Sequence, residues 1–236
     1  MNLNPEIQII RSSHSSSKLN WDWITSEIST SLSEILEDDD WNRKSSLWMM
    51  IWRMNPPHIW HINVIKRILE ETDRVILFLW SANVQDYRNP FSYEERKYFI
   101  EHYFSEELKE SKLIVEWLDD VWNFEKWVWI LWNKIQSTFP DFEWYLNIYW
   151  WDFQEDMALQ AISEYVNKLP VEPSKMIFTE VSRDSLLIDW EEVSATNLRK
   201  ALLEDNYELI YKLVPKKISE LIIGNYSKVL DILKSP

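Results

Sequence analysis

The chain has 236 residues, of which 46% are hydrophobic and 27% are charged, and this composition is typical of a globular protein with a sizeable core. Its net charge of −14 argues against broad nucleic-acid binding, which needs a basic surface. The absence of cysteine excludes disulfides and thiolate metal sites, and no apolar run reaches membrane length. We expect a cytoplasmic protein that holds any anionic ligand with a local cluster of Arg, His and backbone N–H groups.

Glycine and tryptophan occur in unusual numbers. An average composition would give about 17 glycines in a chain of this length. The sequence has 1 glycine and 16 tryptophans, many of them in turn contexts such as Asp40-Trp41-Asn42 and Asp189-Trp190-Glu191. Positive φ is cheap for glycine and costly for a bulky residue. We hypothesise that most of these positions are glycine in the natural protein, through a genetic code that reads UGA as glycine. The alternative is a truly Trp-rich protein with an aromatic surface.

Residues 1–46 form a polar extension, in which the apolar spacing between Ile24 and Leu36 predicts one helix and the rest predicts loop. From residue 47 onwards, strand patterns alternate with helix patterns. The predicted strands cover residues 47–52, 74–79, 112–116, 145–149 and 176–179. The predicted helices cover residues 59–71, 92–104, 125–138, 153–166, 194–203 and 216–233. Gly224 can break the last of these helices.

This alternation predicts an α/β fold with a doubly wound, Rossmann-like parallel sheet of about five strands. We expect one domain over residues 47–215, with a C-terminal helical segment at 216–236 packed on it. In such sheets, ligands bind beyond the carboxyl ends of the strands. That rule places the stretch with His58 and His61, the loop after Leu79 and the segment before Ser194 at one rim.

The two histidines are the first candidate site. His58 and His61 follow the Pro56-Pro57 turn and are three residues apart, so they point to one side of a helix first turn. Together with Arg53 they could stabilise charge that develops on a phosphoryl group. The alternative is a pair of ordinary histidines at the surface or the core edge. Zinc is disfavoured, because no third histidine and no cysteine accompanies them.

A second candidate lies at the start of the helix 194–203. Ser194 and Thr196 can offer hydroxyls beside the backbone N–H groups, and Arg199 adds a charged fork one turn later. This set suits the β- and γ-phosphates of ATP. The alternative is an ordinary helix cap. Arg96 lies inside the helix 92–104. Without further information, we expect it to form an ion pair at the surface.

Three motifs carry a resemblance to a known family. With glycine at Trp52 and Trp60, the stretch Trp52–His61 resembles the G-R-x-x-P-x-H and H-x-G-H signatures of the HxGH nucleotidyltransferase superfamily, in the form seen in nicotinamide and nicotinate mononucleotide adenylyltransferases. The stretch Arg88–Arg96 (RNPFSYEER) is similar to the N-P-F-x-x-x-E-R segment of that family. Val193–Arg199 (VSATNLR) resembles its I-S-x-T-x-[IL]-R motif. The three motifs occur in family order.

The resemblance implies adenylyl transfer from ATP to nicotinamide or nicotinate mononucleotide on a nucleotidyltransferase fold, with release of pyrophosphate. It implies catalytic roles for His58, His61 and Arg199. The ATP contacts it implies are Trp52, Arg53, Met54, Trp60, Ser194 and Thr196. The mononucleotide contacts it implies are Trp80, Ser81, Asn89, Arg96 and Trp127. Trp127 would stack on nicotinamide. The alternative is that Trp127 is a core residue of its helix.

The expected partners are ATP and a pyridine mononucleotide, with Mg²⁺ carried on the triphosphate, and neither nucleic acid nor membrane. A homo-oligomer stays open. One alternative is another member of the superfamily, with a pantetheine-phosphate, flavin or sugar-alcohol-phosphate substrate. Another is a non-catalytic nucleotide-binding protein, if the tryptophans are real. In the sequence as written, the indoles of Trp52 and Trp60 would occupy the gap where the backbone approaches the triphosphate, so we expect weak ATP binding or none.

Overall fold

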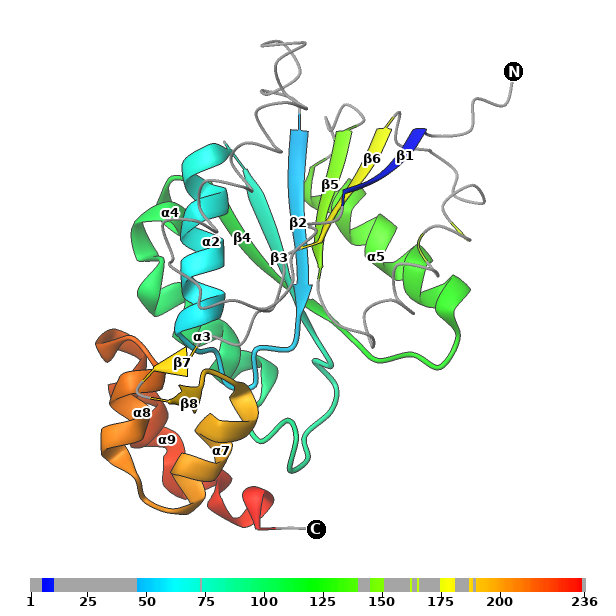
Figure 1. The fold of residues 1–236 in the computed structure, drawn as a ribbon. Helices are drawn as coiled ribbons and strands as arrows, with labels where there is room; N and C mark the ends of the chain where they lie inside the picture. The colour runs from blue at the N-terminus through cyan, green and yellow to red at the C-terminus, as the bar shows by residue number, and fades with distance from the viewer. Residues whose placement is uncertain are drawn as a thin grey trace. The chain divides into compact units, whose positions relative to one another are not determined.

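The computed structural model (Figure 1) describes most of the chain. The chain divides into two compact units. The described residues are 6–10, 46–72, 74–139, 145–150, 162, 165, 175–180, 187–188 and 190–234. The first unit comprises Met1–Met50 and Val121–Asp184, and the second comprises Ile51–Asp120 and Ser185–Pro236. Each unit is an α/β assembly.

Parallel strands build the first unit. Strand β5 (Tyr145–Trp150) pairs with β6 (Lys175–Glu180) on one side and with β2 (Ser46–Trp52) on the other, and all of these pairings are parallel. The helix α5 (Phe124–Thr138) begins at Asn123, whose side chain accepts a hydrogen bond from the backbone N–H of Lys126. The strands and the helix α5 confirm the predicted parallel α/β pattern.

One strand of this unit was not predicted. Residues Glu6–Ile10 form β1, which pairs in parallel with β6, so the expectation of loop at this point of residues 1–46 was wrong. The short run EIQII is rich in β-branched residues that favour an extended chain once a partner strand is present. The helix predicted between Ile24 and Leu36 lies outside the described residues, as does nearly all of the helix predicted at 153–166.

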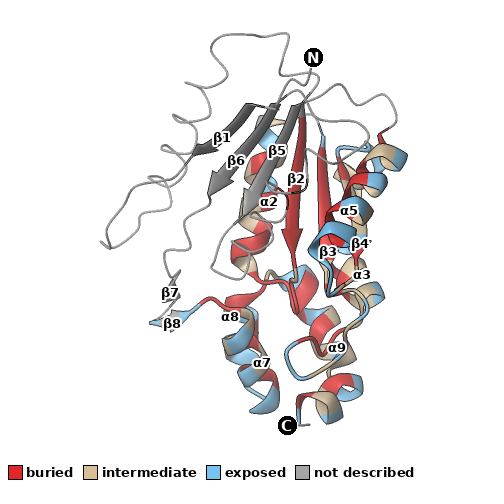
Figure 2. Ribbon diagram, turned by 90° about the vertical axis from the view of Figure 1, so that its right-hand side faces the viewer, coloured by how far each residue is buried: buried red, intermediate tan, exposed pale blue. Residues whose placement is uncertain are grey.

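The second unit contains the parallel pair β3 (Val75–Trp80) and β4 (Leu113–Leu118). The first five residues of β3 are buried (Figure 2), and they form a continuous apolar run (VILFL), as is typical of a strand covered on both faces. Both strands begin one residue later than predicted. Because the two strands run in the same direction, their carboxyl ends, Trp80 and Leu118, lie side by side.

Four predicted helices of this unit are confirmed: α2 (Ile59–Glu71), α3 (Tyr93–Tyr103), α7 (Ala195–Leu203) and α9 (Lys216–Leu233). The elements that were not predicted are α4 (Ser105–Lys109), α8 (Tyr207–Leu213) and the antiparallel strands β7 (Leu187–Ile188) and β8 (Glu191–Glu192).

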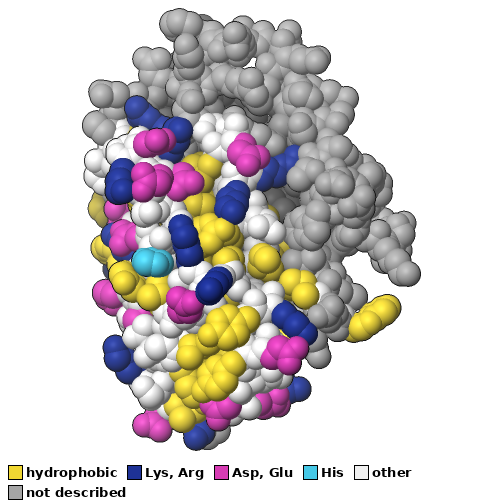
Figure 3. All heavy atoms as spheres, turned by 90° about the vertical axis from the view of Figure 1, so that its left-hand side faces the viewer, with side chains coloured by type: hydrophobic (Ala, Val, Ile, Leu, Met, Phe, Trp, Pro, Cys, Tyr) yellow, Lys and Arg dark blue, Asp and Glu magenta, His cyan; other side chains and the backbone are white. Residues whose placement is uncertain are grey.

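The C-terminal helix α9 packs against α3, α7 and α8. It runs unbroken through Gly224, so the break allowed there does not occur. One glycine costs a helix only about 1 kcal/mol, and a buried apolar face that includes Ile218, Ile222 and Val229 anchors α9 on both sides of it. No helix in the described part of the chain is long and apolar enough to cross a bilayer. Figure 3 shows a face of mixed basic, acidic and hydrophobic side chains.

Candidate active site

The connection from β2 to α2 carries the two histidines. His58 is the N-cap of α2 and His61 lies in its first turn, and both side chains are buried, with 1% and 3% of their surface exposed. Their ring centroids are 3.9 Å apart, and the backbone N–H of His58 donates to Nδ1 of His61 at 3.2 Å. A neutral His61 therefore carries its proton on Nε2. Two imidazoles thus share one helix start, where backbone N–H groups and a partial positive charge gather.

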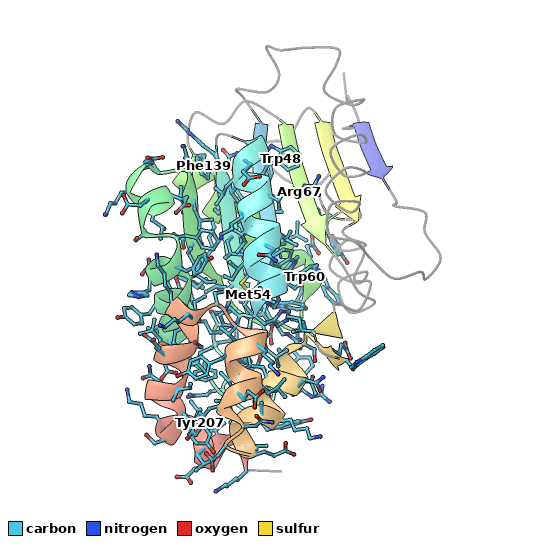
Figure 4. All side chains as sticks on the ribbon, turned by 60° about the vertical axis from the view of Figure 1, so that its left-hand side comes forward. Trp48, Met54, Trp60, Arg67, Phe139 and Tyr207 are labelled. Atoms are coloured by element: carbon cyan, nitrogen blue, oxygen red, sulfur yellow. The ribbon has the colours of Figure 1, made fainter. Side chains whose placement is uncertain are left out.

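Two indoles fill the space beside these histidines. Trp52 and Trp60 have ring centroids 5.4 Å apart, and each lies within 5.6 Å of the His61 ring. Figure 4 shows Trp60 near Met54 at the start of α2, whereas Arg67 lies toward its other end. Both indoles are buried, and no described residue pairs with Nε1 of Trp52. A buried unpaired donor costs roughly 1–3 kcal/mol. Glycine at both positions would leave this volume to a ligand.

The β2–α2 turn is tied to two segments that are distant in the sequence. Nη1 of Arg199, on α7, donates to the carbonyl of Asn55 at 2.8 Å. The buried amide of Asn55 makes two bonds with the backbone of Phe91, donating to its carbonyl at 2.9 Å and accepting from its N–H at 3.0 Å. The structure therefore brings together the three motifs that carried the family resemblance. Sequence reasoning missed Asn55, because its pairing partner lies 36 residues away.

The start of α7 presents the predicted hydroxyls in different ways. The Ser194 hydroxyl caps the helix by accepting from the backbone N–H of Asn197 at 3.1 Å, which is the alternative that the sequence left open. The exposed Thr196 hydroxyl accepts from Nη2 of Arg199 at 3.2 Å. Thr196 thus orients the guanidinium of Arg199. The roles of Ser194 and Thr196 toward ATP stay predictions.

Arg199 interacts with charged groups of both signs. Burial is the main cause that lowers its pKa; the positive charges of Arg88 and Arg53 lower the pKa further, whereas Asp86 and Tyr87 raise it. The Arg53 guanidinium lies 4.8 Å from the Trp80 ring, and Nε of Arg88 donates to the Tyr87 hydroxyl at 2.8 Å. Like charges held together favour a polyanion between them. We gave Arg88 no role from the sequence, although its place directly before the N-P-F segment was a signal.

The loop that follows β3 contains two further predicted residues. Ser81 is buried, and its hydroxyl donates to Oδ1 of Asp120 at 3.1 Å. The backbone and side-chain N–H groups of Asn89 both donate to the Asp86 carboxylate, at 2.8 and 3.0 Å. The buried Oδ1 of Asn89 has no partner among the described residues. Ser81 and Asn89 therefore shape this loop, and the Asn89 amide oxygen is an acceptor that a ligand could use.

Arg96 is held by the backbone around the strand ends. Its side chain is fully buried, and its guanidinium donates to backbone carbonyls of Arg53, Trp80, Ser81 and Ser92. The desolvation that comes with burial lowers its pKa to about 10. The contact with a mononucleotide that the resemblance implies stays a prediction.

Trp127 belongs to the first unit, where it is buried on α5 next to Val128. That placement fits the alternative of a core residue, and stacking on nicotinamide stays a prediction. In the described ranges, no group of three or more His, Cys, Asp or Glu side chains could hold a metal ion.

Known proteins resemble this chain in sequence pattern and in fold. A family model described as cytidylyltransferase-like matches residues 53–201. Two solved structures of a bifunctional NMN adenylyltransferase/ADP ribose pyrophosphatase from Francisella tularensis, one complexed with AMP and a manganese ion, match with 19% and 20% identity and TM-scores of 0.55 and 0.56. These matches cover 79% and 80% of this chain and 53% and 52% of that protein. A search of curated proteins found no match.

A third similar structure comes from Vibrio parahaemolyticus, from a protein proposed to be a nicotinate-nucleotide adenylyltransferase. It has 17% identity and a TM-score of 0.52, and the match covers 81% of this chain and 97% of that one. At these identities the structures show the fold, and the chain spans only about half the length of the Francisella protein. The family model covers more than half of the chain and includes the histidine pair, Arg96 and Arg199. The chain therefore belongs to the cytidylyltransferase-like family.

Proposed function

We propose that this protein transfers the adenylyl group of ATP to nicotinamide or nicotinate mononucleotide, forming the dinucleotide and pyrophosphate. The observation that carries the proposal is a set of basic groups: the Arg199 guanidinium binds the Asn55 carbonyl at 2.8 Å, in the turn that leads to two buried imidazoles at a helix start. Such a set suits a triphosphate. The family match supports nucleotidyl transfer in general, and the similar structures with adenylyltransferase names favour a pyridine mononucleotide as acceptor.

In the proposed reaction, a phosphate oxygen of the mononucleotide attacks the α-phosphorus of ATP in line, and the bond from that phosphorus to the bridging oxygen of the β-phosphate breaks. Pyrophosphate leaves with the electron pair of that bond. His58 and His61 stabilise charge on the transferring phosphoryl group, and Arg199 holds the leaving pyrophosphate. Arg53 and Arg88 add charge around the same turn. Catalysis on this scheme is positioning and charge stabilisation, without a covalent enzyme intermediate.

The proposal includes a divalent cation that arrives with ATP. We expect Mg²⁺ to be held mainly by phosphate oxygens and water, as is usual for this ion with nucleotide substrates. The manganese ion in the structure of the Francisella protein is consistent with divalent metal use in proteins of this fold.

The test is a pyrophosphate-release assay with ATP or CTP against a panel of acceptors. The acceptors are nicotinamide mononucleotide, nicotinate mononucleotide, pantetheine phosphate, a flavin phosphate and a sugar-alcohol phosphate. The enzyme is assayed as written and as the double variant Trp52→Gly/Trp60→Gly, with Trp129→Gly as control because Trp129 is an exposed residue of α5. We expect the double variant to form the dinucleotide. The other two forms should be slower by roughly 100-fold or more, because a phosphate group held out of position reacts about that much more slowly.

Two results would overturn parts of the proposal. Activity confined to CTP, or to an acceptor other than a pyridine mononucleotide, would replace the proposed substrates by those of another superfamily member. Equal ATP binding by the written chain and the double variant would remove the glycine hypothesis at these positions. It would favour a nucleotide-binding protein in which the indoles of Trp52 and Trp60 contact the ligand.

A further inference from the structure

Arg96 is the most completely buried charged side chain in the described part of the chain, with 0% of its surface exposed. Its Nη1 donates to the carbonyls of Arg53 and Trp80, at 2.6 and 2.8 Å. Its Nη2 donates to the Ser81 carbonyl at 3.1 Å, and Nε donates to the Ser92 carbonyl at 3.4 Å. One cation thus connects the end of β2, the end of β3 and the start of α3.

The carbonyls that Arg96 holds flank two strained residues. Met54 follows Arg53 directly and has φ 48°, and Ser81 has φ 54°. A left-handed conformation costs an ordinary residue roughly 1–2 kcal/mol. Such conformations persist where the surroundings fix them, and they cluster at functional sites. The bonds from Arg96 end on the peptide group before Met54 and on the peptide groups on both sides of Ser81.

The same strand ends present the candidate active site. The turn after Arg53 contains Asn55, whose carbonyl accepts from Arg199, and it leads directly to His58. Trp80, whose carbonyl Arg96 binds, places its ring 4.8 Å from the guanidinium carbon of Arg53. A shift of either strand end would therefore move the histidine pair relative to the arginines.

We propose that Arg96 is a positioning residue, which holds the strained carboxyl ends of β2 and β3 in place and so aligns the histidine pair with the arginines. This inference rests on the proposed function for its kinetic consequence, but its structural part stands on the hydrogen bonds alone. A lysine at this position keeps the charge and loses the planar fork that reaches several carbonyls at once.

The structural part is tested by amide hydrogen exchange on the full chain, comparing Arg96→Lys with wild type. Lys97→Met is the matched control, because Lys97 is the next residue of α3 and pairs at 3.6 Å with Glu101 at the helix surface. We expect exchange at residues 53–55 and 82–84 to accelerate by about 10-fold or more in Arg96→Lys, through local opening, while α9 changes by less than about 2-fold. Equal exchange in all three proteins, or acceleration spread evenly over the chain, would overturn the proposal. If Arg96→Lys does not fold, Arg96→Gln takes its place, because its amide still donates and no charge is buried.

The kinetic part uses the same variants in the Trp52→Gly/Trp60→Gly background. We expect kcat to fall by about 10-fold to 100-fold with both KM values nearly unchanged, since misplaced catalytic groups slow the chemical step. A rise in KM for the mononucleotide alone would show direct contact and overturn the positioning role. Unchanged kcat and KM per folded molecule would show a purely structural role and also overturn it. Absence of activity in the parent would count against the proposed function, and the exchange experiment would still decide the structural part of the inference.

Discussion

The starts of α2 and α3 lie in the same unit and share a capping pattern, but the capping side chains differ in charge. At α3, the Ser92 hydroxyl accepts from the N–H of Glu95 at 3.3 Å, and the Glu95 carboxylate accepts from the N–H of Ser92 at 2.9 Å. Glu94 adds a second negative charge to that first turn. At α2, His58 and His61 take the places of Ser92 and Glu95, and Nδ1 of His61 accepts from the N–H of His58 at 3.2 Å. The first turn of α2 contains no acidic residue.

The two helix starts therefore differ in charge, because a carboxylate caps α3 where an imidazole caps α2. At α3, the Ser92 hydroxyl and the Glu95 carboxylate each accept from one backbone N–H, and the acidic side chains offset the partial positive charge of the helix. The start of α2 has imidazoles instead, and the guanidinium of Arg199 binds the turn that leads to it. The α3 start is therefore a structural feature, whereas the α2 start suits a phosphate group.

The largest effect is expected from His61→Asn, assayed in the Trp52→Gly/Trp60→Gly background. An asparagine oxygen can still accept from the His58 N–H, so the local structure is kept and the imidazole is lost. We expect kcat to fall by roughly 10³-fold, the size seen when a donor to a transition-state charge is removed. The control is His102→Asn, which changes an exposed histidine of α3. A loss of less than about 3-fold in pyrophosphate release would remove His61 from the proposed chemistry.

Arg199→Gln is expected to have the next largest effect. The variant keeps a donor near the Asn55 carbonyl but removes the charge that would face pyrophosphate. We expect kcat/KM for ATP to fall by about 100-fold, because a charge-assisted bond to a phosphate is lost. Lys200→Met is the control, since Lys200 is the adjacent residue and its partner at 3.9 Å, Glu204, is also at the surface. Steady-state kinetics at varied ATP distinguish the two variants, and similar values for both would contradict the role of Arg199.

Local patterns were sufficient to predict most of this fold. Strand β3 and helix α3 depend on residues close together in the sequence, an apolar run and a capping box respectively. Both elements were predicted close to their observed bounds. Strand β1 could not be predicted, because five residues become a strand only through pairing with β6. For Gly224, packing of α9 outweighed a small local penalty.

The candidate site was predictable only in part, because some of its contacts join segments that are distant in the sequence. The motifs placed His58, His61 and Arg199 in one region, because each lies at a helix start that follows a strand or a turn. The position of Arg96 depends on carbonyls up to 43 residues away, which no local pattern reveals. The same holds for Asn55 and its partner Phe91.

Ser92→Ala tests the structural half of the comparison. Loss of this cap should lower the free energy of unfolding by about 1 kcal/mol, measured by urea denaturation. Because acidic side chains offset the partial positive charge at the start of α3, we expect kcat and KM to stay within about 2-fold of the parent when the protein is folded. A fall in kcat/KM of more than about 10-fold at unchanged stability would show that this helix start also serves the reaction, and the contrast with α2 would fail.

The smallest effect on stability is expected from the tryptophans. Backbone strain is the cause at some of these positions, and the ligand site is the cause at others. Trp190 has φ 72° and is 88% exposed, so its indole has little packing to lose. Relief of the left-handed strain, about 1–2 kcal/mol, should exceed the entropic cost of glycine, about 0.5–1 kcal/mol. We therefore expect Trp190→Gly to raise the unfolding free energy slightly, whether or not ATP is present.

Trp122→Gly is the matched control for Trp190→Gly. Trp122 is fully exposed and lacks positive φ, so glycine there should give no gain in stability. Replacement of the buried Trp52 and Trp60 by glycine removes core packing, so it should lower stability without ATP. It should stabilise the chain only when ATP binds in the space that the indoles leave. Urea denaturation with and without ATP separates the three cases. If Trp190→Gly destabilised the protein as much as Trp122→Gly, backbone strain would no longer support glycine at position 190, and the hypothesis would rest on the ligand site alone.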